Sequence, residues 1–128
     1  EKSILTDFAR DLSHRIAGGR AFDCLITDDT ELRRLKLAFL AKDYPTDVLS
    51  FPNDGALGEI AISVERAEVQ ARAFGHSRID EIRILMLHGL LHLSGMDHEN
   101  DRGEMARAEA HWRAQFGLPE TLIARTVA

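Results

Sequence analysis

The segment between Ser77 and Gly95 restricts the fold more than any other, because it is apolar on almost every side of a helix. Ser77 followed by Asp80 is typical of a helix N-terminus, and Gly95 is typical of a helix end. A helix without a polar face has to be covered by the rest of the chain. We therefore predict a central, buried helix. Its apolar residues are Ile79, Ile82, Ile84, Leu85, Met86, Leu87, Leu90, Leu91 and Leu93.

The remaining elements follow from hydrophobic periodicity and from capping and turn residues. Helical spacing is present over 3–17, over a short segment after the N-cap candidates at 28–30, from the cap Ser63 to about Phe74, and from the cap Asp101 to about Phe116. Strands are expected over 21–27, 46–52 and 58–62, with a turn at 53–55. This α-β-α-β-β-α-α-α order predicts one α+β domain over residues 1–128, with helices packed on a small mixed β-sheet.

Composition limits the classes of partner. The chain has 128 residues, and 16 basic against 21 acidic side chains give a net charge of −5. An acidic chain is not a general polyanion binder, so nucleic-acid contact requires a local basic patch or a bound cation. The single cysteine, Cys24, cannot form an internal disulfide, and no apolar run is long enough to span a bilayer. We expect a cytoplasmic protein with no membrane partner.

Three histidines fall within the central helix and the turn after it. His88 and His92 are four residues apart, so on a helix both imidazoles lie on one face and can bind one ion. Gly95 can turn the chain, which would bring back His98 as a third ligand. Three histidines leave the fourth tetrahedral position of zinc open, which is typical of a catalytic site. We predict a metal site on these three residues.

Two motifs and a shorter element resemble those of a known family. The segment HGLLHLSGMDH at 88–98 resembles the H-G-x-L-H-L-x-G-x-D-H motif of the YbeY family, which comprises bacterial endoribonucleases and ribosomal RNA maturation factors. The segment KDYPTDVLSFP at 42–52 and LGEI at 57–60 are similar to the family's K-D-x-P-T-D-V-L-S-F-P and L-G-D-I elements.

This resemblance implies a zinc-dependent endoribonuclease with one Zn²⁺ per chain on His88, His92 and His98. It implies a role in maturation of the 3′ end of small-subunit ribosomal RNA and in ribosome quality control. The implied partners are ribosomal RNA, the small ribosomal subunit with one of its proteins, and an assembly GTPase.

One departure from the family pattern concerns a position linked to catalysis. Leu40 stands where the family has an arginine linked to catalysis, and leucine cannot hold a phosphate. Lys42 or a nearby arginine could substitute, and a rim of Arg33, Arg34, Lys36 and Lys42 is one hypothesis. The catalytic residues are left unassigned.

Two alternatives remain open. The first is a metzincin-like metal hydrolase of another substrate class, although Gly89 stands where such peptidases have their general-base glutamate. The second is a non-catalytic ribosome assembly factor with a bound metal, which Leu40 favours. Asp97 could orient a ligand or stabilise the turn. Thr46 and Asp47 could line the cleft, whereas Cys24 reads as an inert core thiol. The remaining histidines are expected to be structural or exposed; they are His14, His76 and His111.

Overall fold

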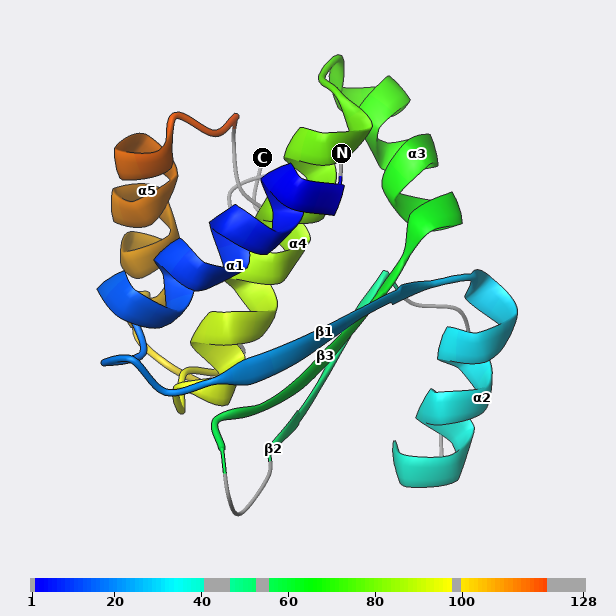
Figure 1. Ribbon diagram of the computed structural model, residues 1–128, viewed down its shortest axis with the longest axis horizontal. Helices are drawn as coiled ribbons and strands as arrows, with labels where there is room; N and C mark the ends of the chain where they lie inside the picture. Colours follow the sequence, from blue (N-terminus) through cyan, green and yellow to red (C-terminus); the bar gives the residue numbers. More distant parts are fainter. Residues whose placement is uncertain (1, 41–46, 53–55, 98–99, 120–128) are drawn as a thin grey trace.

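The computed structural model describes residues 2–40, 47–52, 56–97 and 100–119, and within them the helices and strands follow the predicted order (Figure 1). The elements are α1 (Lys2–Arg15), β1 (Phe22–Thr27), α2 (Asp29–Leu40), β2 (Val48–Pro52), β3 (Gly58–Ser63), α3 (Val64–Phe74), α4 (Arg78–Leu93) and α5 (Glu104–Phe116). The predicted α+β class is confirmed.

The three described strands form one mixed sheet in the order β1-β3-β2. β1 pairs with β3 in parallel and β2 pairs with β3 antiparallel, so that Ala61 lies between Leu25 and Leu49. β3 is buried except at Glu59, because it is paired on both edges and covered on both faces. A small mixed sheet was predicted, and it places β2 at an edge.

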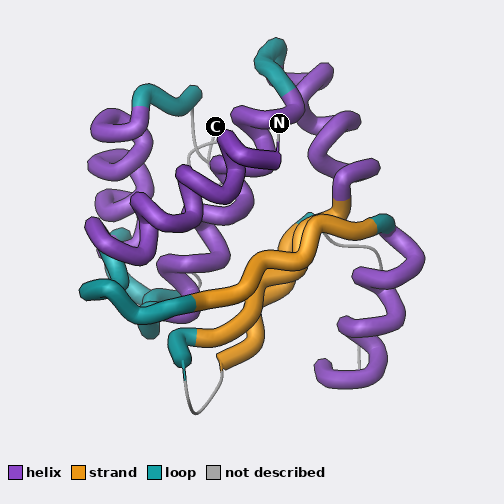
Figure 2. Tube along the Cα trace, viewed as in Figure 1, coloured by secondary structure: helices purple, strands orange, loops and turns teal. Residues whose placement is uncertain are grey.

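Helix α4 is the centre of the larger core, as its composition predicted. It lies on one face of the sheet against β2 and β3, and α1, α3 and α5 pack against it (Figures 1 and 2). Its apolar side chains are buried except Ile79 and Leu93, which are partly buried. Helix α2 packs on the opposite face, where Leu32, Leu49 and Ala61 form a second, smaller cluster.

Two glycines let the sheet and α4 approach closely. A Cβ on Gly89 would lie 3.0 Å from Ile60 Cγ2 and 3.1 Å from Ser50 Oγ. Ser50 Oγ donates a hydrogen bond of 3.1 Å to the Gly89 carbonyl, which joins β2 directly to α4. Gly58 has a φ of +149°, and its added Cβ would lie 2.4 Å from the Phe51 carbonyl oxygen. A side chain at position 89 would press against Ile60 and Ser50 of the sheet, and one at position 58 would collide with the backbone of β2 and lie 2.7 Å from Leu93 Cδ2 on α4.

The predicted helix caps are largely confirmed. Ser63 and Ser77 accept hydrogen bonds from the backbone N–H groups of Arg66 and Asp80. The start of the last helix was predicted too early, since α5 begins at Glu104 with Gly103 at its N-cap position. Asp101 still contacts the start of this helix, because one of its carboxylate oxygens accepts from the N–H group of Gly103 at 2.8 Å and the other accepts from that of Met105, in the first turn of α5, at 3.0 Å.

Within the described part of the chain, no helix combines the length and the apolar character that a membrane crossing requires.

Candidate metal centre

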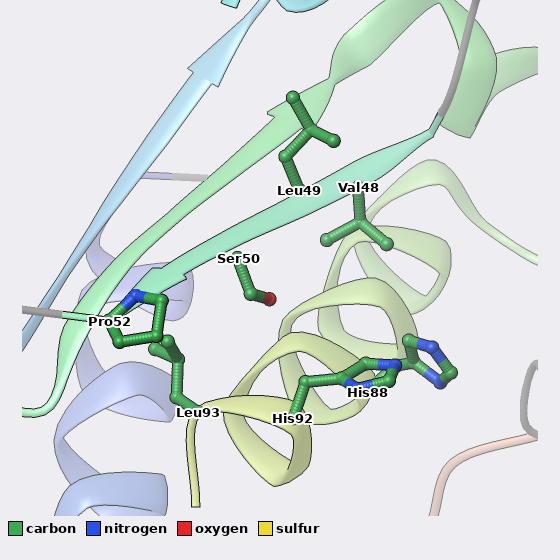
Figure 3. Close-up of a pocket in the computed structure, with 7 residues that line it drawn as sticks. All are labelled: Val48, Leu49, Ser50, Pro52, His88, His92 and Leu93. Carbon is green, nitrogen blue, oxygen red and sulfur yellow. The ribbon is translucent and has the colours of Figure 1, made fainter. Parts of the chain in front are cut away.

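Helix α4 places His88 and His92 on one side, one turn apart. Their ring centroids are 4.7 Å apart with an interplanar angle of 75°. Figure 3 shows the two rings close together on one side of α4. The predicted convergence of these two imidazoles is therefore present, and their spacing is compatible with two nitrogen ligands on one ion.

The two histidines line a pocket of about 340 Å³ between α4 and the edge strand β2. Val48 and Ser50 point from β2 toward α4, while Leu49 points to the other face of the sheet (Figure 3). Pro52 and Leu93 complete the apolar part of the wall. An ion at the histidines would thus have polar ligands on one side and an apolar wall on the other.

A buried carboxylate that the sequence analysis missed contacts the first of these histidines. Oε2 of Glu109 on α5 lies at a hydrogen-bond distance of 2.5 Å from Nδ1 of His88, and both side chains are buried. A signal for this residue exists in the sequence. Glu109 is four residues after the buried Met105 and three before the partly buried Trp112, so it occupies a core position of α5.

The third predicted ligand, His98, lies outside the described residues, as do Thr46 and Lys42. Within the described ranges, no three His, Cys, Asp or Glu side chains are grouped to hold a metal ion. The residues that are described nevertheless fit a metal. Two imidazoles share one pocket, and a carboxylate occupies the Nδ1 side of one of them, which is a common arrangement around zinc ligands.

Other predicted site residues lie elsewhere. Asp47 accepts a hydrogen bond of 2.8 Å from Gln70 on α3 and is not among the described residues that line the pocket. Asp97 accepts one of 2.6 Å from Asn100, which fits the turn-stabilising interpretation. Arg34 donates to Glu31 at 2.9 and 2.6 Å. Helix α2, which carries Arg33, Arg34 and Lys36 of the proposed basic rim and ends at Leu40, packs on the face of the sheet opposite α4 (Figure 1).

The remaining thiol and imidazoles are structural or exposed, as expected. Burial raises the pKa of the Cys24 thiol to about 12, so it stays protonated at neutral pH. His76 donates a hydrogen bond of 2.7 Å from Nε2 to the buried Glu81. His14 and His111 are exposed, and His111 packs edge-on against Trp112.

Position 89 bears on the peptidase alternative. A metzincin-like site has its general-base glutamate directly after the first histidine. Gly89 occupies that position here and packs against Ile60 and Ser50, and even a methyl group would require these neighbours to move. The geometry therefore disfavours peptide hydrolysis by that mechanism.

Together, the fold and the pocket define a small α+β protein with paired histidines on a buried helix beside an edge strand. The family model for "Endoribonuclease YbeY" matches residues 2–117. The chain belongs to the YbeY family.

Several curated relatives carry the name Endoribonuclease YbeY. The protein of Solibacter usitatus is 60% identical over 119 residues, which cover 92% of this chain and 81% of the relative. That of Koribacter versatilis is 52% identical and covers 80% and 68%. That of Nautilia profundicola is 43% identical and covers 94% and 93%. A solution structure of TM1509 from Thermotoga maritima is similar, with a TM-score of 0.59, 26% identity, and coverage of 88% of this chain and 84% of that one.

Proposed function

We propose that this protein is a metal-dependent endoribonuclease that acts in the processing of ribosomal RNA. The observation that carries the proposal is the convergence of His88 and His92 in one pocket of a YbeY-family fold. The names of the curated relatives support hydrolysis of RNA phosphodiester bonds. The finer role in maturing the 3′ end of small-subunit ribosomal RNA, and in ribosome quality control, follows from the sequence resemblance.

The proposed metal ligands are His88, His92 and His98, with one Zn²⁺ per chain. Zinc held by three neutral histidines would lower the pKa of a bound water and neutralise charge on phosphate oxygens. His88 and His92 bind through neutral imidazole nitrogens, so they add no negative charge to oppose an RNA backbone. The short distance between the rings lets both reach one ion without moving the helix.

The pocket walls determine how a phosphodiester enters. Val48, Pro52 and Leu93 keep part of the wall apolar, which limits competing water near the imidazoles. The Ser50 hydroxyl donates a hydrogen bond to the Gly89 carbonyl, and this bond joins β2 to α4. Among the described strands β2 is at an edge of the sheet, so an extended substrate could lie alongside it.

The net charge of −5 matters for how RNA is bound. The chain as a whole repels a polyanion at long range, so binding depends on the cation and on local basic groups. We propose that the small ribosomal subunit, one of its proteins and an assembly GTPase supply further contacts in the cytoplasm. Such partners would place the RNA at a pocket that has little long-range attraction of its own.

The test compares His88→Ala and His92→Ala with His111→Ala, which removes an exposed imidazole outside the pocket. Bound metal is measured by elemental analysis, and cleavage by gel assay on structured ribosomal RNA fragments. We expect the first two variants to lose metal and cleavage together and the third to retain both. Cleavage by a metal-free double variant would refute the proposal.

A wild-type protein that binds zinc and leaves all RNA fragments intact would favour the non-catalytic assembly factor. Leu40, where the family has an arginine, is the observation behind this second candidate. A parallel assay on casein separates RNA cleavage from peptide hydrolysis, which the packing of Gly89 disfavours.

A further inference from the structure

Glu109 is a buried carboxylate whose position is explained by its partner. It is 0% exposed, and Met105 one turn earlier is equally buried, so this side chain enters the protein interior rather than solvent. Burying a carboxylate costs free energy unless hydrogen bonds compensate for the lost hydration. The hydrogen bond of 2.5 Å with His88 Nδ1 is such a compensation, and it joins residues 21 positions apart on α4 and α5.

The chemistry of this pair determines where His88 carries its proton. An ionised carboxylate only accepts hydrogen bonds, so Nδ1 of His88 has to be the donor. A neutral imidazole has one N–H, and its other nitrogen then carries the lone pair. With the proton on Nδ1, the lone pair is on Nε2, which is the nitrogen that a pocket-bound ion would use.

We propose that Glu109 is a positioning residue that holds His88 in the Nδ1–H tautomer and fixes its ring orientation for metal binding through Nε2. This inference rests on the proposed metal site. It assigns to α5 a function in the site, although the described residues that line the pocket come only from β2 and α4. Carboxylates in this relation to a ligating histidine also raise its basicity toward the metal.

A purely structural role predicts something different. If the pair only joined α5 to α4, removing the charge would lower stability and leave the intrinsic zinc affinity of the folded protein unchanged. Glu109→Gln separates these roles, because the amide preserves size and can donate as well as accept a hydrogen bond. An amide N–H donating to Nδ1 would move the imidazole proton to Nε2, where it would compete with the metal.

The experiment measures zinc dissociation constants by competition with a chelating dye, for the wild type and for Glu109→Gln. We expect binding to weaken roughly 10- to 100-fold in the variant. The matched control is Glu81→Gln, which alters a second fully buried glutamate of the described residues, one that is bonded to His76 away from the pocket. The control should bind zinc as the wild type does, whatever stability it loses.

A second readout needs no metal and no variant. Long-range ¹H–¹⁵N spectra of the zinc-free wild type, recorded at increasing pH until the His88 signals stop changing, report which ring nitrogen carries the proton. We expect Nδ1–H. A predominant Nε2–H form, or zinc affinity within about twofold of wild type in Glu109→Gln, would overturn the inference. A wild type that has the Nδ1–H tautomer but binds no zinc would instead contradict the metal site.

Discussion

The part of the chain that the structure describes contains two buried histidine–glutamate pairs, and they differ in what surrounds them. His88 and Glu109 are 2.5 Å apart, and His76 and Glu81 are 2.7 Å apart. Both glutamates are 0% exposed. The first pair uses Nδ1 of its histidine and the second uses Nε2. We call them the pocket pair and the core pair.

The difference teaches that the surroundings of a buried histidine–glutamate pair, and not the contact alone, make it a candidate for metal binding. The pocket pair has a second imidazole 4.7 Å away and faces a pocket of about 340 Å³. The core pair joins the turn after α3 to the first turns of α4, five residues apart in the chain. The same contact thus joins two neighbouring segments in one place and, in our proposal, supports a metal ligand in the other.

The largest expected difference between the pairs is in RNA cleavage. His88→Ala should lower kcat/KM about a thousandfold, or about 4 kcal/mol of transition-state stabilisation, because a metal ligand is lost. His76→Ala should leave the kcat/KM of the folded fraction within about twofold of wild type. Single-turnover assays on one RNA fragment check both. Equal losses of kcat/KM in the two variants would mean that the pocket pair and the core pair do not differ in their contribution to cleavage.

The next largest expected difference between the pairs is in the free energy of unfolding that is gained when zinc binds. At free zinc about 100 times Kd, the wild type should gain about 2.7 kcal/mol in free energy of unfolding. His88→Ala should lose this gain. Glu81→Ala should keep it, although its zinc-free stability falls by about 1–3 kcal/mol because a buried hydrogen bond is broken. Urea unfolding with and without zinc measures both quantities, and a zinc gain missing from Glu81→Ala would contradict the comparison.

Gly89→Ala tests the packing beside the pocket pair. The added methyl group would lie 3.0 Å from Ile60 Cγ2. Overpacking typically costs about 1–3 kcal/mol, and the better helix propensity of alanine returns about 1 kcal/mol. We expect a net loss of up to about 2 kcal/mol in urea unfolding. Val69→Ala, at a helix position that is 64% exposed, is the control and should change stability by less than about 0.5 kcal/mol.

The smallest effect is expected at Cys24, which belongs to neither pair. Burial raises the pKa of its thiol from 9.0 to about 12, so the thiolate that zinc prefers is absent at neutral pH. Cys24→Ala should therefore leave the zinc Kd unchanged. Because the folded pKa is the higher one, the thiol's contribution to stability is complete below pH 9 and is lost as pH rises toward 12. Slow alkylation of the native protein at pH 8, against fast alkylation in urea, checks the protection.

The order of elements could be predicted because each one carries a local signal. Ser63 and Ser77 cap their helices, and the apolar composition of α4 required its central position. The start of α5 was misjudged because Asp101 satisfies N–H groups of a turn as readily as those of a helix. His88 and His92 could be paired from their spacing alone, whereas His98 stays a prediction.

The two glutamate partners could not be assigned in the same way. Glu109 meets His88 only after α5 has packed on α4, and no spacing rule connects residues 21 positions apart. The core pair is local, but His76 and Glu81 meet across the end of one helix and the start of the next. Burial of a charged residue at a core position of a helix was the available signal, and it identifies a candidate without identifying its partner.

Because Glu109, the residue that contacts His88, lies on α5, its place late in the chain has a consequence for biosynthesis. A nascent chain that has emerged only as far as α4 already contains both imidazoles of the pocket, but Glu109 is still missing. If Glu109 fixes the His88 tautomer as proposed, cleavage competence would be delayed until α5 has docked, late in translation. A premature stop codon before Glu104 would accordingly yield a polypeptide that retains the signature histidines and lacks the support of the first.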